Sequence, residues 1–426
     1  MTQQPSDGET LRREQRGLFH NTLAALAGQA GAMVFGLGAM AATTRLLGAG
    51  GYGRLTVFFM ALGVANQLLL SWPNLAMVRF GREAMAQGQG VGPALRARAR
   101  LYFAGAAVVT ALVCALHAPL GAYLGLGRMG PWLLLAYALL LAPVEGLTAG
   151  FQAAGWFRCM AAVGAGVKLL NFALLGLLWL AARQAEPGDV LARHLVSLAV
   201  VFAVGAAVAR PLWRGQAAAP ALARRMAAYA WPVTLAGLGN VVAEWAGPAV
   251  LKACRSIEDV GAYGVACQAA TMTGGLRAAA AAVAWPLVMS LAAQRRDRAL
   301  QWYLDDLCRA VAALTGLGLA AAAMAAEAIP WVFGPAFRLS VAPSQMLLAS
   351  VGFSVIFAMT QNVASACERV RAASLATLVL AVVSLGGGAL LAPRFGPTGM
   401  AAATLAAFAV QAALGVAVAN SVGSLR

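Results

Sequence analysis

Five charged residues lie inside long apolar stretches of the sequence and are the first candidates for chemistry. Glu145, Lys168 and Arg277 fall near the middle of such stretches, Glu244 lies somewhat towards one end, and Glu327 lies close enough to an end to reach water. An ionised side chain near the centre of a bilayer costs at least about 2.5–3.5 kcal/mol. A residue kept there therefore needs a partner or a water-filled space.

These charges allow two interpretations. In the first they pair across adjacent helices, Glu145 with Lys168 and Glu244 with Arg277, and serve the structure alone. In the second the cations face a water-filled cavity and bind an anionic ligand, while the carboxylates tune them. Arg277 would then hold a phosphate through two parallel hydrogen bonds, whereas Lys168 would act as a compact point charge.

Side-chain amides inside the same apolar stretches could line this cavity. Each of them also fits an ordinary interhelical hydrogen bond. As a group they predict a hydrophilic interior suited to sugars. They are Asn66, Gln67, Asn74, Asn171, Asn240, Gln268, Gln361 and Asn362.

Enzyme signatures are missing from the sequence. His20, His117 and His194 are far apart and near the ends of apolar stretches, and no HExxH, Walker A or GxSxG pattern occurs. Gly48 to Gly53 spell GxGxxG, but they follow an apolar stretch instead of a β-strand, which argues against a dinucleotide site. We expect no catalytic residue, no metal and no cofactor, and we predict that the chain is not an enzyme.

The composition identifies the elements that must position these residues. The chain is 61% hydrophobic and 11% charged, whereas soluble domains are about 25% charged. Apolar runs of roughly 20 residues recur from end to end, each long enough to cross a ~30 Å hydrocarbon core. They lack the alternation of barrel strands, so helices are expected. We predict an all-α polytopic membrane protein with about 12 transmembrane helices, with ten or eleven as the alternative because some connections are short. The expected spans are 20–46, 55–78, 101–121, 131–153, 159–181, 192–212, 227–250, 262–289, 307–332, 344–366, 371–393 and 398–420.

The net charge of +16 is interpreted as a topology signal. Lys and Arg gather in alternate connections, for example at Arg96, Arg98 and Arg100. By the positive-inside rule these connections and both termini face the cytoplasm. Membrane lipids, and no nucleic acid, are the partners that this pattern indicates.

A short pattern recurs about half a chain later. Tyr52 and Tyr263 are each followed by Gly, and Trp72 and Trp285, further along, are each followed by Pro. The prolines predict kinks, and the Tyr-Gly turns are expected at the same external corner of each copy, with Tyr at the membrane interface. A parallel repeat of two six-helix lobes follows, an architecture common in transporters. The predicted division is a cytoplasmic tail (1–19), a first lobe (20–212), a basic linker (213–226), a second lobe (227–420) and a tail (421–426).

Several motifs resemble those of one known family. TTRLLGAGGYGRLTVFF (43–59) followed by WPNLAMVRFG (72–81), then VFGPAF (332–337) and PRFGPTGMAAAT (393–404), are similar to elements of Wzx-type polysaccharide flippases of the MOP superfamily. The resemblance implies 12 helices in two parallel lobes, as in the other transporters of that superfamily. It also implies a bacterial inner-membrane protein that takes a polyprenyl-diphosphate-linked oligosaccharide across the membrane by alternating access.

The resemblance further implies a role in the synthesis of O-antigen, capsule, lipopolysaccharide or exopolysaccharide, with a polymerase and chain-length machinery as partners. A cationic cavity belongs to the family picture, and depth and charge make Lys168 and Arg277 the candidates for the diphosphate. A multidrug or cation antiporter and a lipid II flippase of the same superfamily remain alternatives. The first span carries no acid, which weakens the drug-efflux alternative. A membrane-embedded glycosyltransferase or ligase is a further alternative, which the short external loops disfavour.

Overall fold

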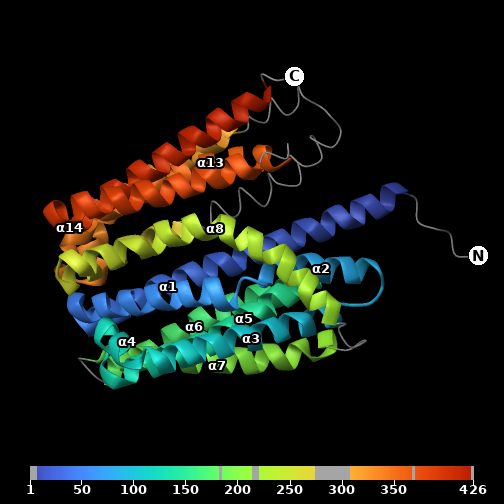
Figure 1. Cartoon of the computed structure of the whole chain (residues 1–426), viewed down its shortest axis with the longest axis horizontal. Coiled ribbons are helices and arrows are strands. Elements are labelled where there is room, and N and C mark those ends of the chain that lie inside the picture. Colours follow the sequence, from blue (N-terminus) through green and yellow to red (C-terminus); the bar gives the residue numbers. More distant parts are fainter. Residues whose placement is uncertain (1–6, 182–184, 214–219, 274–307, 367–369, 424–426) are drawn as a thin grey trace, which may run out of the picture. The chain divides into compact units, whose positions relative to one another are not determined.

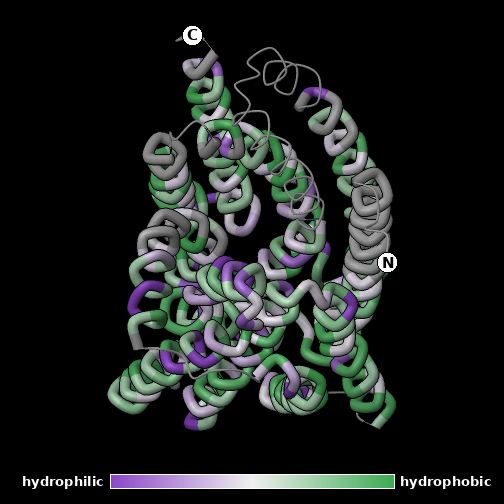
Figure 2. The backbone as a smooth tube through the Cα atoms, turned by 90° about the vertical axis from the view of Figure 1, so that its right-hand side faces the viewer, coloured by the Kyte–Doolittle hydropathy of each residue, from purple (hydrophilic) through white to green (hydrophobic). Residues whose placement is uncertain are grey.

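The computed structural model of the chain describes residues 7–181, 185–213, 220–273, 308–366 and 370–423, with the backbone alone for some of them, including Asn240, Glu244 and Asn362. Every regular element within these ranges is a helix (Figure 1), and hydrophobic residues run along the helices (Figure 2). A further helix without a label covers residues 257–273. The other elements are α1 (Asp7–Ala65), η1 (Asn66–Leu70), α2 (Asn74–Ala86), α3 (Gly92–Ala115), α4 (His117–Leu124), η2 (Gly127–Met129), α5 (Gly130–Ala153), α6 (Phe157–Ala181), α7 (Pro187–Ala209), η3 (Arg210–Trp213), α8 (Pro220–Cys254), α11 (Cys308–Ala325), η5 (Ala326–Ala328), α12 (Ile329–Phe333), η6 (Pro335–Ser340), α13 (Val341–Ala366) and α14 (Val370–Gly423).

Eight helical stretches in the described ranges are long and apolar enough to cross a bilayer. Two of them are double length, and each consists of two helices joined at a glycine: Gly48 in α1 (φ 62°, ψ −175°) and Gly396 in α14 (φ 59°, ψ −138°). These backbone conformations are almost confined to glycine. Both glycines fall in connections between predicted spans, after 20–46 and after 371–393, so the predicted break between the two spans at each place is confirmed.

The chain divides into two compact units. The first holds residues 1–43 and 65–232, and the second holds residues 44–64 and 233–426. The predicted first lobe, 20–212, includes residues 44–64, which the units group with the second half of the chain. The boundaries of the lobes stay a prediction.

Helix α5 is central to the first unit, because it packs against α2, α3, α6 and α7. Figure 1 shows α3, α5, α6 and α7 running side by side. Near one end of these helices, Met77, Phe80, Leu95, Ala149 and Met226 belong to one buried apolar cluster. A polar residue in the body of α5 therefore meets neighbouring helices instead of lipid.

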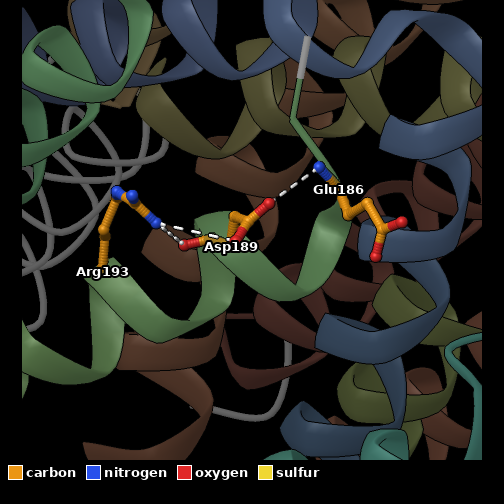
Figure 3. Close-up of polar contacts among 3 residues, drawn as sticks. All are labelled: Glu186, Asp189 and Arg193. Atoms are coloured by element: carbon orange, nitrogen blue, oxygen red, sulfur yellow. Dashed lines mark hydrogen bonds and ion pairs between the residues drawn. The ribbon is translucent and has the colours of Figure 1, made fainter. Parts of the chain in front are cut away.

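The beginning of α7 is fixed by a capping box (Figure 3). Glu186 precedes the helix, and the Asp189 carboxylate accepts a hydrogen bond from the Glu186 backbone N–H at 3.1 Å. Arg193, one turn on, donates to the Asp189 carbonyl at 2.9 Å. Such caps satisfy backbone groups that the first turn leaves open. The cap sets the register of α7, and with it the position of His194.

In the second unit, the two copies of the sequence repeat meet each other. A Cβ atom on Gly53 would lie 2.0 Å from the carbonyl oxygen of Ile257, and one on Gly261 would lie 2.2 Å from the carbonyl oxygen of Ala49. Gly53 follows Ala49 by four positions and Gly261 follows Ile257 by four positions, so the contact is reciprocal. Two copies of one motif, packed backbone to backbone, are expected to meet in this way. Small residues permit that approach.

The glycine contact is not in register with the tyrosines of the repeat. The contact pairs Gly53 with Gly261, whereas the sequence repeat aligns Gly53 with Gly264, so the contact is offset by three residues from the sequence repeat. Tyr263 is 1% exposed, with its hydroxyl 3.3 Å from Thr404 Oγ1. The Tyr263 ring is therefore packed in the core of the second unit, and its depth at the membrane interface stays a prediction.

Candidate functional site

Three of the predicted site residues, Asn66, Asn74 and Glu145, come together in the first unit. Asn66 begins the π-helix η1, Asn74 begins α2, and Glu145 lies on α5. A residue that the sequence analysis did not select, Arg98 of α3, joins them. We call these four residues together with Ser71 the Glu145 cluster.

The π-helix arises where the predicted second span, 55–78, breaks. The backbone N–H of Ser71 donates to the Asn66 carbonyl at 2.7 Å, a bond that spans five residues instead of four. Pro73 has no N–H, so the Leu69 carbonyl loses its usual helical donor. That oxygen faces Gly105 of α3, where a Cβ atom would be only 2.0 Å away. Single π-turns are rare and are frequent at functional sites.

Glu145 is bound at both carboxyl oxygens. Its Oε1 accepts from Asn66 Nδ2 at 3.0 Å, and its Oε2 makes a short hydrogen bond with the Ser71 hydroxyl. The Ser71 hydroxyl also lies 2.9 Å from Asn66 Oδ1. Three side chains thus form a closed ring that ties the π-turn to α5.

Arg98 is buried, at 5% exposure, beside this ring. Its Nε donates to Asn74 Oδ1 at 3.1 Å and its Nη2 donates to the Ala142 carbonyl at 2.6 Å. The sequence interpretation of Arg98 as a cytoplasmic residue before a span starting at 101 is wrong in this respect, because α3 begins at Gly92 and carries Arg98 into the bundle. The one sequence sign was its position four residues before Tyr102, whose ring lies under the guanidinium at 5.5 Å.

Helix α5 continues through Pro143, and another side chain supplies the missing donor. Proline removes the N–H that would bind the Leu139 carbonyl. The Tyr102 hydroxyl donates to that carbonyl at 2.6 Å instead. The local irregularity at Pro143 is thereby satisfied from α3, next to Arg98.

Lys168 does not pair with Glu145, so this part of the structural-pairing interpretation is wrong. Within the described part of the chain the ammonium group of Lys168 has no hydrogen bond and no ion pair within 4.0 Å, and it interacts electrostatically with His194 of α7. Asn171, three residues on and 8% exposed, has an Oδ1 atom without a hydrogen-bond partner among the same residues. Two polar groups on one face of α6 are thus open to a ligand.

His194, which the sequence analysis set aside, is also part of the first unit's polar interior. Its Nδ1 is hydrogen-bonded to the Tyr137 hydroxyl, and the two rings meet edge-on at 5.2 Å. Tyr137 is 2% exposed. A histidine near the end of an apolar stretch gives no sequence sign of this contact, which depends on the register of α7.

The remaining predicted residues are dispersed or lie outside the description. Gln67 is exposed, whereas Gln268 and Gln361 are half-buried. Glu327 is exposed and accepts from Gln345 Nε2 at 3.2 Å, and its access to water stays a prediction. Arg277 lies outside the described residues, as do the side chains of Glu244, Asn240 and Asn362, so the predicted Glu244–Arg277 pair remains a prediction.

Comparisons with known proteins agree with this helical architecture. A family model described as "Polysaccharide biosynthesis protein" matches residues 18–291. Among solved structures, an inward-facing multidrug resistance MATE family transporter of the MOP superfamily is similar with a TM-score of 0.76 and 12% identity, covering 95% of this chain and 98% of that chain. A MOP superfamily transporter from Pyrococcus furiosus has a TM-score of 0.69 and 12% identity, with 99% of both chains covered. The lipid II flippase MurJ has a TM-score of 0.67 and 11% identity, with 93% of this chain and 87% of that chain covered. No curated protein matches the sequence.

Proposed function

Because the chain belongs to the polysaccharide biosynthesis protein family and is a multi-pass membrane protein with the fold of MOP superfamily transporters, we propose that it translocates a polyprenyl-diphosphate-linked oligosaccharide across the bacterial inner membrane. The saccharide would be a repeat unit for O-antigen, capsule or exopolysaccharide synthesis. Alternating access of the two predicted lobes, with both termini in the cytoplasm, is the proposed mode of transport. A polymerase with its chain-length machinery would take over the product.

The observation that carries this proposal is the pair of open polar groups on α6. The Lys168 ammonium lacks a hydrogen bond and an ion pair in the described residues, and the Asn171 carbonyl oxygen beside it lacks a donor. Burying such groups without partners is costly. A ligand that offers a phosphate oxygen to Lys168 and a hydroxyl to Asn171 would satisfy both, and a lipid-diphosphate-linked sugar contains both groups.

The other sequence candidates complete the proposed binding region. Arg277 would supply a second cation for the diphosphate, since guanidinium groups bind phosphate oxygens in pairs. Glu244, Asn240, Gln268, Gln361 and Asn362 would come from the second half of the chain to meet the saccharide. These assignments rest on residue type and position within the apolar stretches.

The test is complementation of a strain from which the gene has been deleted. Such a strain should accumulate the lipid-linked saccharide in the cytoplasmic leaflet, and the wild-type gene should clear it. Loss of one charge-assisted contact costs about 1.5–3 kcal/mol, so Lys168→Ala and Arg277→Ala should each lower the translocation rate about tenfold or more. Lys168→Arg should retain most of the rate, and Arg128→Ala, which removes an exposed charge on η2, should be silent.

Two results would contradict the proposal. Full clearance of the lipid-linked saccharide by the double variant Lys168→Ala with Arg277→Ala would contradict the assignment of these residues as the cationic site. Absence of any accumulation in the deleted strain would contradict the proposed cargo. Export of a cationic drug or of lipid II by the purified protein would then favour the alternatives within the same superfamily.

A further inference from the structure

The ring formed by Asn66, Ser71 and Glu145 has three contacts that each need one proton. Asn66 Nδ2 supplies the proton for Glu145 Oε1. The Ser71 hydroxyl contacts both Asn66 Oδ1 and Glu145 Oε2, but a hydroxyl has only one proton to donate. If Glu145 is ionised, one contact in the ring joins two acceptor atoms.

A neutral carboxyl removes this conflict. Glu145 then donates from Oε2 to Ser71 Oγ, Ser71 donates to Asn66 Oδ1, and Asn66 donates to Glu145 Oε1. The result is the same if the amide of Asn66 is turned over. In that case Glu145 donates from Oε1 to the amide oxygen, the amide nitrogen donates to Ser71, and Ser71 donates to Oε2. The proton count therefore does not depend on how the amide is assigned.

We propose that Glu145 is a proton-binding site and that its proton closes the ring in this conformation. The ring joins both ends of the π-turn, since Asn66 and Ser71 are also the acceptor and donor of its backbone hydrogen bond. Loss of the proton would replace one hydrogen bond with a repulsive contact between oxygens. Release of the π-turn from α5 follows.

The ionised carboxylate has an alternative partner close by. Arg98 interacts electrostatically with Glu145 and packs against Gly146, the next residue of α5. Two of the five guanidinium N–H groups are used by Asn74 and Ala142. Glu145 can therefore exchange a protonated arrangement with Asn66 and Ser71 for an ionised one with Arg98. Two discrete arrangements of one side chain are what a switch requires.

No other titratable side chain on the helices around α5 is hydrogen-bonded to Glu145 or ion-paired with it among the described residues. Tyr102 of α3 is hydrogen-bonded to the Leu139 carbonyl. Lys168 of α6 and His194 of α7 interact with each other. On α2, η1 and the residues between them, the groups that contact the cluster are the neutral side chains of Asn66, Ser71 and Asn74. Among the short helices before α5, His117 of α4 is hydrogen-bonded to the backbone carbonyl of Arg128 of η2. Arg98 is thus the cation that decides the ionised arrangement.

Hydrogen exchange in the purified full-length protein, embedded in lipid nanodiscs without cargo, tests this site. After correction for the intrinsic effect of pH, protection of the amides in residues 66–77 should fall about tenfold or more as pH rises. Glu145→Gln offers a donor and an acceptor in the pattern of the neutral acid, so protection should stay high at every pH. Glu145→Ala should be weakly protected at every pH, and Glu83→Gln, which changes a half-exposed acid on α2, should follow the wild type.

Infrared difference spectra between low and high pH provide a second measurement. The wild type should show the carbonyl band of one protonated carboxyl group that Glu145→Gln lacks and that Ser71→Ala shifts. A wild-type protection profile that is flat in pH, or a Glu145→Gln profile that follows the wild type, would overturn the proposal, as would an unchanged carboxyl band in Glu145→Gln.

Coupling of this proton to transport rests on the proposed function, but the site itself does not. If complementation fails and the exchange profile holds, the cargo is wrong and the proton site stands. If complementation succeeds at a rate that is independent of Glu145 and the exchange profile is flat, the transporter stands without this switch.

Discussion

Arg98 lies so close to Gly146 that a Cβ atom at residue 146 would be 2.6 Å from the guanidinium carbon. The guanidinium cannot withdraw freely, because it is held by the Ala142 carbonyl and Asn74. Gly146→Ala should therefore displace Arg98 and lower the free energy of unfolding by about 1–3 kcal/mol. Thermal unfolding in detergent measures this. Gly164→Ala on α6, where nothing lies within 4 Å, should be neutral or slightly stabilising, and equal effects of the two changes would contradict the close contact.

Tyr102 and Pro143 should be energetically coupled through the Leu139 carbonyl. Tyr102→Phe removes the donor to that partly buried oxygen and should cost about 1–3 kcal/mol of stability. Pro143→Ala restores a backbone N–H for the same carbonyl. In a double-mutant cycle, Tyr102→Phe should then cost clearly less in the Pro143→Ala background. Additive effects would mean that the hydroxyl does not act on the carbonyl that proline leaves open.

The reciprocal glycine contact predicts that two substitutions far apart in the sequence lower the stability of the protein to a similar degree. Gly53→Ala and Gly261→Ala each place a methyl group against a backbone carbonyl, which cannot rotate away as a side chain can. Each should cost about 3 kcal/mol or more in an unfolding assay. Gly50→Ala is the matched control, since its nearest neighbour is the flexible end of the Glu258 side chain at 3.1 Å. A mild effect at only one of the two glycines would break the reciprocity.

Gly48 and Gly125 should respond differently to asparagine. Both have positive φ, but Gly125 has the left-handed helical conformation (φ 66°, ψ 24°), which Asn tolerates. The ψ of −175° at Gly48 lies in a region almost confined to glycine. Gly48→Asn and Gly48→Ala should both cost about 1–3 kcal/mol, whereas Gly125→Asn should be milder than Gly125→Ala. Comparable melting temperatures of the two Asn variants would contradict this distinction.

The sequence predicts the helical elements well because lipid allows few alternatives. The predicted span 131–153 agrees with α5 (Gly130–Ala153) to within one residue at its start. The predicted span 101–121 begins later than α3 (Gly92–Ala115), because the positive-inside rule assigns Arg96, Arg98 and Arg100 to a cytoplasmic connection. Periodicity alone cannot show that Arg98 is buried in the bundle while Arg96 is half-buried and Arg100 is exposed.

Residue type and depth are enough to predict Asn66, Asn74, Glu145 and Lys168 as site candidates. They do not predict which side chains these residues contact. Glu145 was matched with Lys168 because adjacent spans and opposite charge make that pair plausible. In the structure Glu145 meets Asn66 and Ser71, since the π-turn widens the helix at that point and brings both side chains to α5. Neither the π-turn nor the neutral ring has a signal in the sequence.

The sequence by itself determined that the chain crosses the membrane many times as helices, that glycines lie at the breaks between consecutive helices and that its halves repeat. These follow from the cost of unpaired backbone groups in lipid and from the conformational freedom of glycine, which are local properties. The tertiary structure decided which buried charge meets which partner. Such pairing depends on helix register and on single backbone irregularities, here Pro73 and Pro143, whose freed carbonyls set where α3 and α5 can approach.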